Sequence, residues 1–156
     1  MSYDARQIAN WFVERARADG TALSIMSLLK LTYIAHGWHM ELRKLPLFDN
    51  KIEAWQYGPV IPDVYHAFRN QGVHVSGSVD APKPLIADGD SQLLSQIWDI
   101  YGHMSAFKLS DLTHEVGGPW HIASSAGGPY ARIPNEAIQK HYEMKRLQAQ
   151  QAQYAD

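Results

Sequence analysis

The segment W-Q-Y-G-P-V-I-P-D-V-Y-H-A-F, residues 55–68, combines large aromatic side chains with two prolines in a short stretch. Pro59 restricts Gly58 to an extended or left-handed turn conformation, and Pro62 suits the first turn of a helix. We therefore expect the end of a strand, a rigid kink and then a helix over Asp63–Gln71. The segment holds no obvious nucleophile, metal cage or phosphate loop, so its fixed aromatic surface favours a recognition protein over an enzyme.

Two helices are predicted on the N-terminal side of this segment. Asp4 and Gln7 resemble a capping box, which starts a helix that runs to Ala18. Ser24 is expected to cap a longer helix that ends near Leu42, and the short link between the two helices predicts an antiparallel helical hairpin. The apolar face of the second helix consists of Leu28, Leu31, Ala35, Trp38, His39 and Leu42.

Little strand structure is predicted. Residues 51–55 alternate polar and apolar side chains, as a half-exposed strand does, and Val73–Val75 is a second short strand expected to pair with them. The loop from Gly77 to Asp90 has the length of functional or mobile loops. With six or seven helices expected, the fold class is mainly α (α+β), a compact single domain with a two- or three-stranded β element.

The C-terminal half of the chain predicts further helices, separated by glycine-proline breaks. Ser91–Met104 forms the clearest of them, and Ser110 is expected to cap a short helix before the first break. A last helix follows over Asn135–Arg146. Residues 147–156 are rich in Gln and Ala and are expected to form a flexible or frayed helical tail, which leaves a domain over residues 1–146.

Composition limits the classes of partner. The chain has 156 residues, 46% of them hydrophobic, which suits one domain with a substantial core. Its net charge is −2, with 14 basic and 16 acidic residues interspersed, so no basic cluster predicts direct binding to nucleic acid. The absence of cysteine excludes disulfides and thiolate chemistry. No leader pattern and no bilayer-length apolar run is evident, so we expect a cytoplasmic protein without a membrane partner.

Eight histidines raise the question of a metal site. His36 and His39 lie about one turn apart on the second predicted helix, which places both imidazoles near one face. Zinc sites require three or four converging ligands, and the spacing specifies no third ligand here. The H-E-x-x-H pattern is also absent. A structural role for both histidines is therefore favoured, and we predict no metal and no cofactor.

A catalytic reading rests on a second group of residues. His114 and Glu115 pair a base with a carboxylate, and Ser110 or Thr113 is a possible nucleophile. Adjacent helix positions do not face each other, so the His–Glu pair is not a ready dyad. The sequence has no G-x-S-x-G elbow to expose a serine. We therefore assign no catalytic residue and do not predict an enzyme.

The aromatic side chains divide into two groups. Trp11, Trp38 and Trp98 fall on predicted helices near the apolar stripe and are expected to be buried. The aromatics at turns or strand ends are Trp55, Tyr57, Tyr65 and Trp120. These suit two interpretations equally: they anchor a protein interface, or they close the core over the small β element.

Four blocks of sequence carry a resemblance to a known family. They are L-L-K-L-T-Y-I-A-H-G-W-H (residues 28–39), P-L-F-D (46–49), I-E-A-W-Q-Y-G-P-V-I-P-D-V-Y (52–65) and L-S-D-L-T-H-E-V-G-G-P-W (109–120). In content and order the chain resembles the Panacea domain family of SocA-like antitoxins, also described as phage-associated GepA-type proteins. Within these blocks, Lys30, Tyr33, His36, Glu115 and Pro119 match positions of the family, in addition to the residues predicted below to bind a partner.

The resemblance implies a small bacterial or prophage protein that neutralises a toxin encoded nearby by direct binding. The residues predicted to bind this partner are Trp55, Tyr57, Gly58, Pro59, Val60, Pro62, Tyr65, His114 and Trp120. An alternative is a proteolytic adaptor that delivers a bound toxin to an AAA+ protease, with the loop over residues 77–90 and the C-terminal tail as docking elements. A weaker alternative is a metalloprotein or hydrolase that uses His36, His39, His114 and Glu115. No oligomeric state is predicted.

Overall fold

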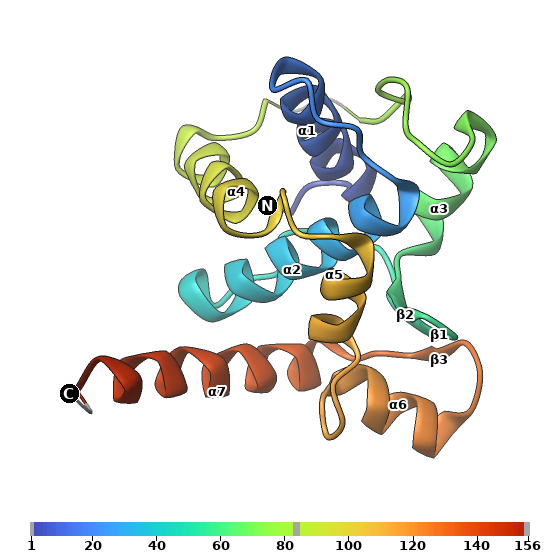
Figure 1. Ribbon diagram of the computed structural model, residues 1–156. Helices are drawn as coiled ribbons and strands as arrows, with labels where there is room; N and C mark the ends of the chain where they lie inside the picture. The colour runs from blue at the N-terminus through green and yellow to red at the C-terminus, as the bar shows by residue number, and fades with distance from the viewer. Residues whose placement is uncertain (1, 83–84, 155–156) are drawn as a thin grey trace.

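The computed structural model describes residues 2–82 and 85–154, except for the side chain of Tyr154. The helices are α1 (Ala5–Ala18), α2 (Ile25–Arg43), α3 (Pro62–Phe68), the 3-10 turn η1 (Arg69–Gln71), α4 (Asp88–Tyr101), α5 (Ala106–Thr113), α6 (Pro119–Gly127) and α7 (Asn135–Tyr154). The strands are β1 (Glu53–Trp55), β2 (Gly58–Val60) and β3 (Ala131–Arg132). The predicted mainly α (α+β) class with a small β element is confirmed (Figure 1).

Helix α2 is the centre of the fold. It packs against α1, α3, α4, α5, α7 and strand β2. The predicted cap is confirmed, because the Ser24 hydroxyl accepts a hydrogen bond from the Ser27 amide at 3.0 Å. From Ser27 to Glu41 every side chain except Trp38 is buried, as expected of a helix that is covered on all sides. The single apolar face predicted for this helix is therefore too narrow, and Leu42, placed on it, is exposed.

The sheet has the order β2-β1-β3, with antiparallel pairs. Strands β1 and β2 form a hairpin in which Trp55 pairs with Gly58 across the turn at residues 56–57. The rigid kink predicted at Gly58–Pro59 is wrong, because this dipeptide begins the second strand of the hairpin. Proline is tolerated there because β2 is an edge strand and needs fewer amide donors.

The partner predicted for the first strand is also wrong. In the segment Val73–Val75, His74 forms only an isolated bridge with Ser24, and β3 takes the place beside β1 instead. Glu53 lies opposite Arg132, and the Ile133 amide donates to the Ile52 carbonyl at 2.8 Å. A strand of two residues has too little alternation to be detected in sequence.

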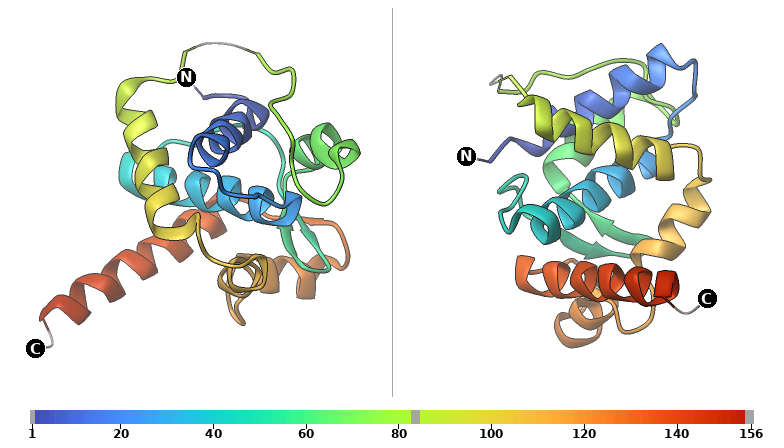
Figure 2. Two further views of the ribbon diagram at one scale, coloured as in Figure 1. Left: turned by 45° about the horizontal axis from the view of Figure 1, so that its top comes forward. Right: turned by 90° about the vertical axis from the view of Figure 1, so that its left-hand side faces the viewer.

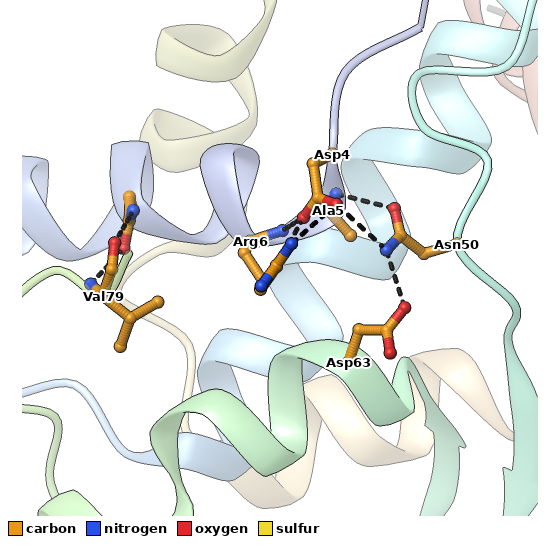
Figure 3. A network of polar contacts seen from close by, with 7 residues as sticks. Asp4, Ala5, Arg6, Asn50, Asp63 and Val79 are labelled. Atoms are coloured by element: carbon orange, nitrogen blue, oxygen red, sulfur yellow. Dashed lines mark hydrogen bonds and ion pairs between the residues drawn. The ribbon is translucent and has the colours of Figure 1, made fainter. Parts of the chain in front are cut away.

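Hydrogen bonds at the start of α1 fix the position of α3 (Figure 3). The Asp4 carboxylate caps α1 by accepting from the Arg6 amide at 2.9 Å, which confirms the predicted start of this helix. Asn50 accepts from the Ala5 amide at 2.8 Å and donates to the Asp63 carboxylate at 2.8 Å. Because Asp63 lies in the first turn of α3, this network ties α3 to α1.

Part of the loop expected to be functional or mobile is held on α1. The Asn10 side chain donates to the Val79 carbonyl at 2.7 Å and accepts from the Val79 amide at 2.8 Å. Ser78 donates to the Glu14 carboxylate at 2.7 Å. Residues 83 and 84, which the prediction includes in this loop, lie outside the described residues.

Helices in the C-terminal half differ from their predicted starts. Helix α4 begins at Asp88 rather than Ser91, and α5 is capped by Ser105, so that Ser110 lies inside α5 instead of at its start. Trp98 is buried in the core, whereas Trp11 and Trp38 are half-buried against it.

Helix α7 starts after Pro134 as predicted and continues through residues 147–154. Figures 1 and 2 show that its second half extends away from the body of the molecule. The division of the chain at residue 146 stays a prediction. Within the described part of the chain, no helix combines the length and apolar character needed to cross a membrane.

Candidate functional site

A pocket of about 430 Å³ opens between α2, the β1–β2 hairpin and α3, and we call it the hairpin pocket. Its lining residues are Ile25, Met26, Leu29, Lys30, Trp55, Gln56, Tyr57, Val60, Tyr65, Arg69 and Tyr130. This volume lies in the range of pockets that take a small ligand or a few side chains of a partner. A larger groove of about 670 Å³ runs between α6 and α7, but it contains no residue predicted to bind the partner.

Aromatic rings form one side of the hairpin pocket. The Trp55 ring makes edge contacts with Tyr65, at a centroid distance of 5.0 Å, and with Tyr130, at 5.5 Å. Tyr57 stands at the tip of the hairpin and is 61% exposed. Edge-to-face pairs of this kind stabilise aromatic clusters beyond the area they bury. The pocket therefore has a fixed apolar side with an exposed tyrosine at its edge.

Tyr130 enters this cluster through an unusual backbone conformation. Its φ of +62° lies in the left-handed region, which is uncommon for a residue other than glycine. The Tyr130 amide donates to the Ala54 carbonyl at 2.9 Å, which holds the residue next to β1. Non-glycine residues in this region persist only where the surroundings enforce them, often at functional sites.

Lys30 forms the polar wall of the pocket. It projects from α2, is 1% exposed and donates from Nζ to the Pro59 carbonyl at 3.0 Å. Burial disfavours its charged form and lowers the pKa of Lys30 to about 8. A lysine of the motif at residues 28–39 is thus placed beneath the hairpin and bound to the edge strand.

Gly58 allows this close approach. Its φ is +118°, which only glycine adopts without strain. A Cβ at this position would lie 3.3 Å from Lys30 Nζ and 3.5 Å from His114 Nδ1. The backbone of the hairpin therefore requires glycine here, and a larger residue would also press on the Lys30 side chain.

Helices α5 and α6 support the hairpin from behind, since α5 packs on β2 and α6 on β1. The Ser110 hydroxyl donates to the Tyr57 carbonyl at 2.7 Å, and His114 Nδ1 lies 3.1 Å from the same hydroxyl. Trp120 Nε1 donates to the Trp55 carbonyl at 2.6 Å. Three backbone carbonyls of the hairpin, including that of Pro59, are thus bound by side chains from three helices.

Of the residues considered for catalysis, Ser110 and His114 are brought together, with Ser110 Oγ 3.1 Å from His114 Nδ1, whereas Glu115 and Thr113 have other partners. Glu115 pairs with Lys145 on α7, at 3.2 Å, and this interaction directs its carboxylate toward α7. Thr113 donates to the Leu109 carbonyl within α5 at 2.9 Å. The Ser110 hydroxyl donates to the Tyr57 carbonyl, so Ser110 and His114 together hold the β1–β2 hairpin against α5.

His36 and His39 have separate partners. His36 stacks on Phe48, with centroids 4.1 Å apart, and its Nε2 lies 2.9 Å from the Asn135 side-chain oxygen. Burial lowers the pKa of His36 to about 4, so the ring is neutral at pH 7. His39 Nδ1 lies 2.7 Å from the Leu45 carbonyl. Over residues 2–82 and 85–154, no three His, Cys, Asp or Glu side chains are grouped to hold a metal ion.

The residues predicted to bind a partner all lie on or next to the β1–β2 hairpin, but in different positions. Those that line the pocket are Trp55, Tyr57, Val60 and Tyr65. Gly58, Pro59 and Pro62 are buried in β2 and at the start of α3, while His114 and Trp120 stand behind the hairpin. Their roles in binding stay a prediction.

Sequence reasoning did not assign Arg69 or Tyr130 to the site. Arg69 gives no local signal, because it follows α3 as one of several exposed polar residues. Tyr130 directly follows the Gly127–Pro129 break, and an aromatic residue after such a break was the one usable signal. Lys30 was carried over by resemblance alone, without a role.

Comparison with known proteins gives a consistent family match. The sequence matches the family described as Antitoxin SocA-like, Panacea domain, over residues 28–121. It is 31% identical over 138 residues to the protein named Antitoxin SocA from Caulobacter vibrioides (strain NA1000 / CB15N), which covers 81% of this chain and 73% of that relative. No solved structure matches the chain. The matched region contains Lys30, the hairpin and its supports, but not Tyr130.

Proposed function

The chain belongs to the SocA-like antitoxin family with the Panacea domain, as its sequence motifs predict, and from this we propose that it is an antitoxin. It neutralises a protein toxin encoded nearby by binding it directly in the cytoplasm. The observation that carries this proposal is the hairpin pocket, which lies largely within the family-matched region and gathers rigid aromatic side chains around an exposed tyrosine.

The side-chain hydrogen bonds that hold the hairpin in place favour such an interface. Aromatic side chains in well-packed pockets supply most of the binding energy at protein interfaces, while the surrounding contacts mainly exclude water. Lys30, Ser110 and Trp120 each bind a carbonyl of the hairpin, so the surface is ordered before the partner arrives. Preorganisation lowers the entropy lost on association.

Neutralisation by binding requires no catalytic group. A standard interface buries about 1,600 Å² in total, which is enough to cover the working surface of a small toxin. The antitoxin then acts by occupying that surface, as a binding protein rather than an enzyme. Tyr57, being 61% exposed at the tip of the hairpin, is the anchor most available to a partner.

Co-expression with the adjacent reading frame of the native locus tests the proposal. The neighbour alone should stop growth, and the pair should grow and co-purify. Tyr57→Ala should abolish both rescue and co-purification, because the hairpin loses its exposed anchor. The matched control is Phe107→Ala, since Phe107 is 80% exposed on α5 and does not line the pocket.

Three outcomes contradict parts of the proposal. A harmless neighbour that does not co-purify removes the antitoxin role. Growth that depends on an AAA+ protease, together with toxin turnover that requires this protein, replaces neutralisation by binding alone with the adaptor mechanism. Rescue retained by Tyr57→Ala, or lost equally in Tyr57→Ala and Phe107→Ala, removes Tyr57 as the specific anchor of the interface.

A further inference from the structure

The hairpin pocket carries positive charge that its own lining does not neutralise. Lys30 and Arg69 are among the lining residues, and no aspartate or glutamate is. The chain as a whole has a net charge of −2, so this excess of cations is local to the pocket. A concave site with apolar walls and one sign of charge attracts ligands of the opposite sign.

Of the two cations, Lys30 gains more from a bound anion, because it is buried whereas Arg69 is exposed. Its Nζ has three donors, and the Pro59 carbonyl is its single hydrogen-bond partner among the described residues. No carboxylate in that part of the chain forms an ion pair with Lys30 or with Arg69. A buried charge without a counter-charge is unfavourable, so an anion that reaches this ammonium is stabilised there.

The rest of the pocket selects what carries the anion. The rings of Trp55, Tyr65 and Tyr130 face the same space as Lys30, together with aliphatic side chains from α2. A fully polar anion leaves these apolar walls without a partner. A ligand with a carboxylate beside a large apolar group satisfies both parts of the lining.

We propose that the hairpin pocket binds a segment of the partner toxin in which an aspartate or glutamate adjoins a large apolar side chain. The carboxylate pairs with Lys30, and the apolar side chain packs on the ring cluster of Trp55, Tyr65 and Tyr130. Arg69, exposed at η1, contributes a second positive charge at the pocket. This inference rests on the proposed antitoxin function and names the chemistry of the element that is recognised.

The hydrogen bond to the Pro59 carbonyl holds the ammonium of Lys30 under the hairpin. A charge-assisted hydrogen bond in a site with little water is stronger than a neutral one. A neutral segment, in contrast, covers the pocket and leaves the ammonium without either water or a counter-ion. The same residue therefore favours acidic segments and rejects neutral ones.

Selection from a random peptide library displayed on phage tests this chemistry without the toxin. The baits are the purified wild-type protein, Lys30→Met and the control Lys140→Met, which removes an exposed lysine outside the hairpin pocket. Wild type and Lys140→Met should enrich peptides with Asp or Glu next to Phe, Leu or Trp. Lys30→Met should keep the apolar preference and lose the acidic one.

Calorimetry on the most enriched peptide gives the quantitative test. Replacing its acidic residue by the matching amide should weaken binding to wild type roughly 10-fold or more, as expected for loss of a hydrogen bond between charged groups. Lys30→Met should bind both peptides equally. Lys30→Gln serves as a second variant, and circular dichroism of each variant verifies the fold.

Several results overturn the inference. Enrichment of neutral peptides, or equal acidic preference in wild type and Lys30→Met, removes Lys30 as the recognition group. Selected segments that match this chain make a second copy the occupant, and a small carboxylate found by native mass spectrometry makes it a metabolite. Because the selection does not involve the toxin, its result is independent of whether co-expression supports the antitoxin role.

Discussion

Two buried charges on the same helix, Glu41 and Lys30 of α2, are treated in different ways by the fold. Glu41 is 2% exposed, and its Oε1 lies 2.6 Å from Lys44 Nζ and 3.3 Å from Arg146 Nε. Lys30 is 1% exposed and has only the Pro59 carbonyl among the described residues. The chain neutralises the first charge internally, whereas the second has no counter-charge among the described residues.

The pKa values of these two groups express the same difference. Burial acts to raise the pKa of Glu41, but the hydrogen bonds from Lys44 and Arg146 outweigh it and the pKa is lowered. Burial alone lowers the pKa of Lys30. A lowered pKa favours the charged form of a carboxyl and disfavours the charged form of an amine. The first charge therefore stabilises the folded state, and the second opposes it until a counter-ion binds.

The largest expected effect is in the pH dependence of Lys30. Its folded pKa of about 8 lies below the ordinary value of 10.5, so the unfolded chain binds more protons between these limits. Relative to Lys30→Met, the wild-type free energy of unfolding should rise by about 3 kcal/mol from pH 7 to pH 10.5. Urea denaturation of both proteins across this range measures the difference.

Lys140→Met is the control for this titration, because Lys140 is exposed. Its unfolding free energy should follow that of wild type at every pH. Parallel profiles for wild type and Lys30→Met would show that Lys30 is not desolvated in the folded protein. Lys30 would then be a solvated cation like those on the surface, and it would no longer contrast with the buried Glu41.

Gly58→Ala examines whether the hairpin holds Lys30 in place. The substitution strains a φ of +118° and places a Cβ 3.1 Å from Lys30 Cε, so a destabilisation of about 2 kcal/mol is expected. Gly72→Ala is the matched control, since Gly72 also has a large positive φ, +93°, but nothing lies within 4 Å of its Cβ position. Its cost should be about 1 kcal/mol, from the backbone alone.

Urea titration, supported by thermal unfolding, measures the free energy of unfolding of both glycine variants. The excess cost of Gly58→Ala over Gly72→Ala is the part that arises from packing on Lys30. Equal costs would mean that Lys30 moves aside freely. The cation would then be mobile rather than fixed in the wall of the hairpin pocket.

Glu41→Gln is expected to have a smaller effect than the two changes around Lys30. It replaces a carboxylate that accepts two charged hydrogen bonds by a neutral amide, which should lower the free energy of unfolding by about 1.5 kcal/mol at pH 7. Because the folded pKa of Glu41 is lowered, its stabilisation is complete above the unfolded value near 4.5 and is lost as pH falls through the folded value. The difference between wild type and Glu41→Gln should therefore shrink in acid, as urea titrations at pH 7 and pH 3 can show.

Local signals in the sequence predicted much of the helical framework. Asp4 and Ser24 are caps whose side chains accept amide hydrogen bonds, and caps depend on neighbouring residues alone. The hairpin was missed because Gly58–Pro59 has the same local signature in a kink and in an edge strand. Val73–Val75 failed as a strand for a related reason: three alternating residues cannot specify which strand lies beside them.

The candidate site divides in the same way. Trp55, Tyr57 and Tyr65 were predictable because they are aromatic and lie close together in a segment with two prolines. Tyr130 depends on the pairing of β3 with β1, which only the tertiary structure determines. The special property of Lys30 is a missing counter-charge, and this depends on where every carboxylate of the fold lies. No single segment of sequence contains that information.

The smallest expected effects are those of the two cations that neutralise Glu41. The side chains of Lys44 and Arg146 are 60% and 35% exposed, and ion pairs of exposed groups typically contribute about 0.2–1 kcal/mol. Arg146→Ala should cost more than Lys44→Ala, because Arg146 is less exposed and joins α7 to α2, whereas Lys44 lies directly after α2. Double-mutant cycles with Glu41→Gln measure each coupling energy.

The sum of these couplings is what distinguishes Glu41 from Lys30. If both cycles give favourable coupling, the folded chain neutralises Glu41 with groups that remain partly in water, which keeps their desolvation small. Coupling near zero for both would mean that the two cations do not stabilise Glu41, which would then be a buried charge without an effective counter-charge, like Lys30. In that case the two buried charges of α2 would differ only in sign. The missing counter-charge of Lys30 would then no longer single out the hairpin pocket as a site for an external anion.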